Sequence, residues 1–229
     1  MSPGARYPQF CALARAAELI GERWTLLVVR ELLLGPKRFT DLAERLAGIS
    51  PSVLAGRLAR MEKAGLVRRS RWPPPAAASV YELTGDGHAL RPAVWELIRW
   101  GGRFLFPARR GEQFEPEWTP LALEALARHG PVPARSFRLR IRQGRKAAVL
   151  RVMGGPSGTS VDRGDGACDA TLTTTVETLL AIVSGALAPD DAVRRGLVET
   201  SGDAEALREF PLLFEVRPAA SEVAAGQGA

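Results

Sequence analysis

The stretch from residue 38 to residue 67 constrains the fold most, because it joins two short helical patterns through a tight turn. In the first pattern Thr40 is expected at the N-cap, and Leu42 and Leu46 keep helical spacing. In the second pattern Ser50 is the expected N-cap, and one apolar stripe recurs at i, i+4 and i+7: Leu54, Leu58 and Met61. This arrangement predicts a helix-turn-helix.

The opposite face of the second helix is small and polar at its N-terminal end and basic further on. The residues expected on this outer face are Ser52, Val53, Gly56, Arg57 and Arg60. Such a helix can enter a major groove, with short side chains near base edges and arginines on phosphates. Outward arginines are also common on the solvated face of an ordinary helix, so the helix alone does not decide its role.

The segment that follows favours the nucleic-acid interpretation. Gly65 ends the helix, Leu66 to Arg71 start an arginine-rich extended run, and residues 80–83 return after the loop WPPPAAAS. Two helices followed by such a hairpin predict a winged helix-turn-helix. The expected DNA contacts, among which Arg38 is equally well explained as solvated, are Arg38, Thr40, Ser50, Ser52, Val53, Arg57, Arg60, Arg68, Arg69 and Arg71.

Several motifs agree in order and spacing with one known family. They include LIGERWTLLVVRELLLG, EKAGLVRR, YELTGDG and a later Trp100. On these motifs residues 9–105 resemble the HxlR family of bacterial transcription regulators. The resemblance implies a homodimer that reads an inverted-repeat operator in double-stranded DNA. It departs at Pro74 and Pro75, which are followed by alanines where family wings usually carry arginine, so a basic contact at the wing tip is expected to be missing.

The HxlR resemblance also singles out Cys11, because this position is a redox sensor in some members. Since a sensor thiol must be exposed and needs a partner, such as its copy in a dimer, the alternative is a cysteine that is merely tolerated. After the hairpin, Thr84 is expected to cap a long helix over residues 85–104, kinked at Pro92. One small domain has limited interior for the apolar stripe of this helix as well as that of the first helix, which favours a dimer interface over packing on its own domain.

The positive charge is placed unevenly along the chain. Residues 1–110 hold 18 Lys and Arg against 9 Asp and Glu, a net charge of +9, whereas residues 111–229 are at −3. This division predicts two domains with different partners, of which the basic one suits a polyanion. The expected organisation is a DNA-binding and dimerisation domain over 1–106, a linker over 107–118, a second domain over 119–217 and a disordered tail over 218–229.

The second half changes from helical to strand periodicity. Phe137, Leu139 and Ile141 alternate with arginines, which predicts a half-buried strand whose basic face is solvated, and Gly144 marks a hairpin. Strands followed by short amphipathic helices predict an α+β sandwich. The C-D-A-T strand, the helix ending in Ser-Gly-Ala-Leu and the Gly-Asp at 202–203 resemble the sterol carrier protein type-2 domain.

That resemblance implies an apolar tunnel between a sheet and its helices, which holds a lipid or another hydrophobic small molecule. Taken one by one, these residues are better explained as plain core packing, and only the resemblance makes them tunnel walls: Phe137, Leu139, Val149, Leu180, Val183, Leu187, Phe210 and Phe214. The fold class expected for the whole chain is therefore α+β, with a winged helix-turn-helix followed by a sterol-carrier-like domain.

The sequence carries none of the spacings that mark an active centre. His88 and His129 are isolated, two distant cysteines do not make a disulfide framework, and no nucleophile elbow or dinucleotide fingerprint occurs. We expect no enzyme, metal or cofactor, no membrane span, and a cytoplasmic location. Three hypotheses stay open: a DNA-binding regulator controlled by a hydrophobic effector, one whose second domain only dimerises or contacts proteins, and a thiol switch through Cys11.

Overall fold

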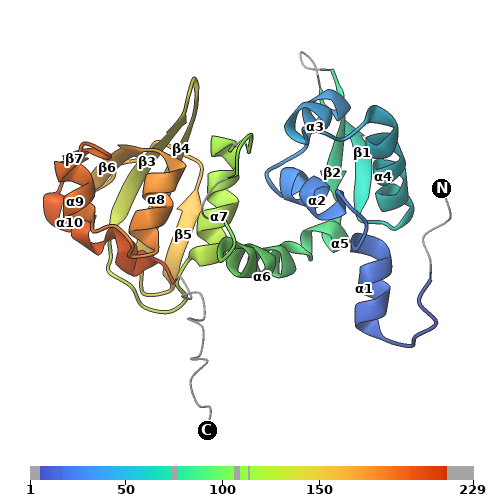
Figure 1. Ribbon diagram of the computed structural model, residues 1–229, viewed down its shortest axis with the longest axis horizontal. Coiled ribbons are helices and arrows are strands. Elements are labelled where there is room, and N and C mark those ends of the chain that lie inside the picture. The colour runs from blue at the N-terminus through green and yellow to red at the C-terminus, as the bar shows by residue number, and fades with distance from the viewer. Residues whose placement is uncertain (1–5, 74–76, 106–108, 113, 216–229) are drawn as a thin grey trace, which may run out of the picture. The chain divides into compact units, whose positions relative to one another are not determined.

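A computed structural model describes residues 6–73, 77–105, 109–112 and 114–215 of the chain (Figure 1). The chain forms two compact units, residues 1–94 and 95–229. The predicted tail over 218–229 and the predicted wing tip at 74–76 lie outside the described residues. The domain limits expected from the sequence stay predictions.

The first unit consists of short helices and one hairpin. Its elements are α1 Ala12–Ile20, α2 Thr25–Leu33, α3 Phe39–Arg45, α4 Pro51–Lys63, β1 Val67–Arg71, β2 Ser79–Leu83, α5 Gly85–His88 and the start of α6 Arg91–Gly102. The limit between the two units falls within α6. The predicted stripe of α4 is confirmed, since Leu54, Leu58 and Met61 are buried. This order of elements confirms the winged helix-turn-helix.

The caps explain where α3 and α4 begin. The Ser50 hydroxyl accepts the N–H of Val53 at 3.3 Å, and Pro51 occupies the first turn of α4, where its missing N–H costs nothing. The prediction that Thr40 caps α3 is wrong. The helix begins two residues earlier, because Arg38 is the N-cap residue and its N–H donates to Asp41 at 3.1 Å.

The hairpin is antiparallel and pairs Val67 with Leu83 at its base and Arg71 with Ser79 further out. The N–H of Trp72 donates to the carbonyl of Ala78 at 2.9 Å, so the pairing continues beyond the strands.

The long helix expected over residues 85–104 is two helices, α5 and α6. Thr84 caps α5 as predicted, accepting the N–H of Gly87 at 3.2 Å. Pro92 is the second residue of α6, and this position lacks an intrahelical acceptor in any helix. Proline therefore starts a helix here and does not kink one.

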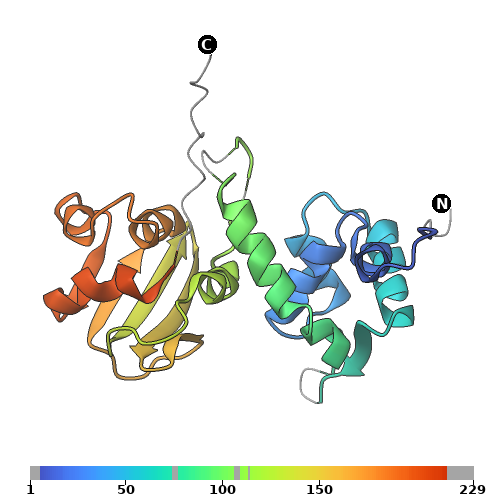
Figure 2. The ribbon, with the colours of Figure 1, turned by 90° about the horizontal axis from the view of Figure 1, so that it is seen from below.

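The second unit is a five-stranded sheet with helices. After α6 the chain runs through η1 Pro116–Trp118, α7 Thr119–Leu126, β3 Ser136–Gln143, β4 Lys146–Gly155, β5 Gly158–Asp162, β6 Ala170–Thr174, α8 Val176–Val183, α9 Pro189–Arg194, β7 Glu199–Gly202, α10 Ala204–Glu209 and η2 Phe210–Leu213. The strand order is β5-β4-β3-β6-β7, and only β3 and β6 run parallel. Figures 1 and 2 show α8 and α9 on one face of this sheet.

Local contacts fix the ends of two helices in this unit. Helix α8 is capped by Thr175, whose hydroxyl accepts the N–H of Thr178. Helix α7 ends at Leu126, and Ala127 and His129 beyond it form β-bridges with distant residues. In the described part of the chain, no helix has both the length and the apolar character needed to cross a membrane.

Candidate nucleic-acid interface

The N-terminal turns of α4 present small side chains to the exterior. Ser50 and Ser52 are exposed and their hydroxyls lie 3.2 Å apart, while Val53 beside them is half-buried. Gly56 lies one turn further along this face, with no atom near the position a Cβ would take. The small side chains and the exposure of this part of the helix match the prediction.

Arg57 does not lie on this face, so the predicted exposure is wrong. Only 6% of the residue is exposed, and its guanidinium forms an ion pair with the carboxylate of Glu22, in the connection between α1 and α2. Burial, followed by repulsion from Arg60, lowers the pKa of Arg57 below its ordinary value. A guanidinium held inside the unit cannot read a base edge, which removes the reason for counting Arg57 among the DNA contacts.

Arg60 lies between the interior and the surface. One of its Nη atoms donates to the Glu22 carboxylate at 2.9 Å, yet 40% of its side chain remains exposed. Arg60 therefore has a protein partner and also access to the exterior.

The outgoing arm of the hairpin carries the exposed cations. Arg68 pairs with Glu82 at 2.9 Å, and Arg69 pairs with Glu62 at 3.2 Å and lies over the Tyr81 ring at 5.1 Å. Arg71 is exposed near the outer end of the arm. Two of the three predicted hairpin arginines thus have partners on the protein, at exposed positions where such pairs are weak and exchangeable.

A contact between α3 and the hairpin adds one residue that the sequence did not suggest. The guanidinium of Arg38 lies over the ring of Trp72, 5.6 Å from its centre, and Arg38 remains exposed. Thr40 is exposed on the same helix. Trp72 was predicted only as part of a loop, because no local pattern connects it to a residue 34 positions earlier.

The other predicted sites divide between surface and interior. Cys11 is exposed and precedes α1 as its N-cap residue. In the second unit Phe137, Leu139, Val183, Phe210 and Phe214 are buried, and Leu180 and Leu187 are partly buried against the same cluster. Val149 is 40% exposed and pairs with Arg140, so it lies on the outer face of the sheet and cannot line a tunnel beneath the helices.

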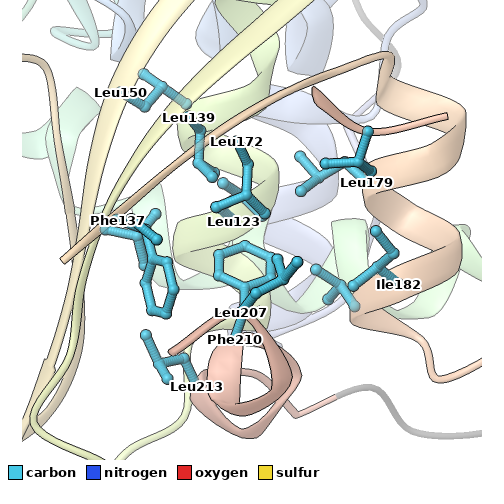
Figure 3. Packing of buried hydrophobic residues seen from close by; sticks show 14 of the residues in the cluster. Leu123, Phe137, Leu139, Leu150, Leu172, Leu179, Ile182, Leu207, Phe210 and Leu213 are labelled. Atoms are coloured by element: carbon cyan, nitrogen blue, oxygen red, sulfur yellow. The ribbon is translucent and has the colours of Figure 1, made fainter. Parts of the chain in front are cut away.

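Side chains occupy the interior of the second unit. The ring of Phe210 lies edge-on to Phe137 at 5.0 Å and to Phe214 at 5.2 Å. Figure 3 shows Leu123, Leu172 and Ile182 pointing into the same space from three different elements. Among the described residues no group of three metal-ligating side chains occurs.

Comparison with known proteins separates the same two parts. The HxlR-like helix-turn-helix model matches residues 19–109, and the SCP-2 sterol transfer family model matches residues 116–215. The HTH-type transcriptional regulator YodB of Bacillus subtilis is 36% identical over 92 residues, which are 40% of this chain and 82% of YodB. The chain belongs to the HxlR-like helix-turn-helix family.

Other HxlR-like relatives agree over the same segment. YvaP of Bacillus subtilis is 33% identical over 94 residues, which cover 41% of this chain and 87% of YvaP. An HTH-type regulator of Mycobacterium tuberculosis is 39% identical over 94 residues, 41% of this chain but only 59% of that relative. A solved structure of reduced YodB, 33% identical, covers 44% of this chain and all of YodB with a TM-score of 0.38.

The fold of this HxlR-like chain brings together most of the predicted contact residues of its first unit. Ser50, Ser52 and Val53 share the first turn of α4, and Arg68, Arg69 and Arg71 share β1. Two relevant residues were missed, Glu22 and Trp72. For Glu22 the sequence offered only its charge, because its partners lie 35 and 38 positions further along the chain.

Proposed function

We propose that this HxlR-like chain is a transcription regulator that binds double-stranded DNA, with the first turns of α4 in the major groove. The observation that carries the proposal is the exposed run of small residues on α4 beside a hairpin rich in exposed arginines. In this arrangement Ser52 and Val53 approach base edges, and Gly56 allows the helix backbone to come close. Arg38, Arg68, Arg69 and Arg71 hold phosphates, and Thr40 and Ser50 donate from their helix ends.

The test is binding to DNA from the protein's own upstream region, measured by fluorescence anisotropy at several salt concentrations. Phosphate contacts predict a logarithmic affinity that falls linearly with the logarithm of salt, by about 0.9 per phosphate. Replacing Arg71 by Gln should reduce that slope by about one. Replacing Arg140 by Gln is the control. Arg140 is an exposed arginine of β3 in the other unit, so this change removes the same charge and should leave the salt slope unchanged. Absence of binding even in dilute salt would refute the proposal.

We also propose that the regulator acts as a homodimer on an inverted repeat. The support is apolar surface that a single chain leaves exposed: Trp100 is 60% exposed, and Phe104 beside it and Leu97 are exposed too. Phe10, Leu13 and Leu19 are exposed around α1. Large apolar side chains gathered on one element commonly mark an interface. A second copy is the partner that the HxlR resemblance implies.

For the second unit we propose control by a hydrophobic small molecule or lipid. The match of residues 116–215 to the SCP-2 sterol transfer family supports this assignment. A ligand regulates only if it prefers one state of the protein. The packed rings of Phe137, Phe210 and Phe214 favour the alternative, a dimerisation or protein-contact module, because a ligand would have to displace them. Mass spectrometry of an organic extract of the purified protein separates the two: a stoichiometric lipid supports the sensor, and its absence supports the module.

A redox switch through Cys11 is the third candidate, supported by the exposure of this residue at the start of α1. Diamide treatment of the wild type and of a Cys11→Ser variant tests it through DNA affinity. A change in the wild type alone supports the switch, and equal affinity in all four samples refutes it.

A further inference from the structure

Glu22 links two parts of the first unit that are far apart in sequence. It lies between α1 and α2. There the N–H of Gly21 donates to the carbonyl of Ala17 at 2.8 Å, and the N–H of Thr25 donates to the carbonyl of Glu22 at 3.1 Å. Trp24, two residues on, has a φ of 78°, a left-handed conformation that is costly for a bulky side chain. The connection is therefore fixed in a specific path, and from it the Glu22 carboxylate pairs with Arg57 and Arg60 of α4.

The two arginines that share this carboxylate are not equivalent. The side chain of Arg57 is 7% exposed and that of Arg60 is 40% exposed. A guanidinium remains charged near neutral pH, and that of Arg57 is too buried for water to take the place of the Glu22 carboxylate. Arg60 lies three residues further along α4, just under one helical turn, where a phosphate oxygen can take the place of the carboxylate at little cost. Arg57 thus holds Glu22 in place, while Arg60 can exchange.

We propose that Glu22 is a positioning and specificity-determining residue for DNA binding, which withholds Arg60 from DNA until α4 is correctly seated. This inference rests on the proposed DNA-binding function. Non-specific binding depends almost entirely on phosphate charge, whereas specific binding adds base contacts. A carboxylate that competes for Arg60 therefore weakens non-specific binding more than specific binding.

The experiment compares specific and non-specific duplexes over a salt series, using the full chain. The main variant is Glu22→Gln combined with Arg57→Met, which removes both charges of this partly buried pair and fills the space of the arginine stem. We expect it to fold, to bind non-specific DNA with a salt slope steeper by about 0.9, and to have a lower ratio of specific to non-specific affinity. Adding Arg60→Gln to this variant should cancel the increase in salt slope.

Glu18→Gln is the matched control, because it removes an acidic charge from the same unit at a residue paired with Arg15 and not with α4. A second variant, Glu22→Asp, keeps the charge for Arg57 but shortens the reach to Arg60, and should change the slope in the same direction. An unchanged slope in the folded variants, a gain that survives Arg60→Gln, or an equal gain in Glu18→Gln would overturn the inference. Failure of the wild type to bind any duplex would instead overturn the proposed function.

Discussion

At the scale of single residues, the burial of Arg57 changes what its removal should do. Truncation of Arg57 to alanine removes the buried one of the two arginines that pair with Glu22, leaves Arg60 as its partner, and opens a space in the interior. Because Glu22 is partly exposed, we expect a loss of roughly 2 kcal/mol, below the 3–5 kcal/mol typical of fully buried pairs. Urea unfolding followed by circular dichroism measures it. Full stability combined with lost DNA binding would show that Arg57 contacts DNA after all.

Two glycines give opposite predictions. A Cβ at Gly87 would lie 2.2 Å from the carbonyl oxygen of Leu66, so Gly87→Ala should cost about 1–3 kcal/mol through overpacking. A Cβ at Gly56 would meet nothing, and an alanine inside α4 should stabilise by about 0.5–1 kcal/mol. Thermal unfolding of both variants provides the comparison.

The Gly56 variant also reports on docking. If α4 lies in the major groove, the added methyl group of Gly56→Ala should weaken specific binding although the protein is more stable. Unchanged affinity would show that this face of the helix stays away from the bases.

At the scale of elements, the sequence predicted the helices better than their contacts. The stripe of α4 follows from its spacing alone, but Arg57 lies at the edge of that stripe, three residues after Leu54 and four before Met61. A residue at this edge can be buried or exposed. Arg57 is buried because it pairs with Glu22, whose position no local pattern reveals. The signal for Val149 was present, because the hairpin pairs Gln143 with Lys146 and this register places Val149 opposite Arg140 on the solvated face.

The start of the parallel pair β3 and β6 depends on one carboxylate. Oδ2 of Asp169 accepts the backbone N–H of Ser136 at 2.7 Å and its hydroxyl at 3.0 Å, and these bonds lower the pKa of Asp169. Because the folded-state pKa lies below the unfolded value, the stabilisation is present above about pH 4 and is lost as the pH falls through the folded value. Amide hydrogen exchange in β3 and β6 should therefore accelerate in acid.

Asp169→Asn should reduce this acid dependence, since an amide keeps one acceptor oxygen but does not titrate. Asp162→Asn in β5 removes an exposed carboxylate of the same sheet and is the control. Identical pH profiles for the wild type and Asp169→Asn would contradict the assignment.

At the scale of the whole molecule, an exposed aromatic pair at the end of α6 predicts the oligomeric state: Trp100 lies in the helix and Phe104 just after it. The rings of Trp100 and Phe104 lie 5.1 Å apart and edge-on, and a single chain leaves both exposed. We expect the wild type to sediment as a dimer and Trp100→Glu as a monomer, because a charge cannot be buried unpaired in an apolar interface. Leu212→Glu, at another exposed apolar residue of the second unit, should remain dimeric.

The same variants separate dimerisation from DNA reading. Two linked binding units gain affinity through their high effective concentration, so the monomeric variant should lose most of its affinity for an inverted repeat. Its affinity for one half-site should equal that of the wild type, because the first turns of α4 and the arm β1 are unchanged. Equal loss on both duplexes would mean that Trp100 supports the fold of the chain and not an interface between two copies.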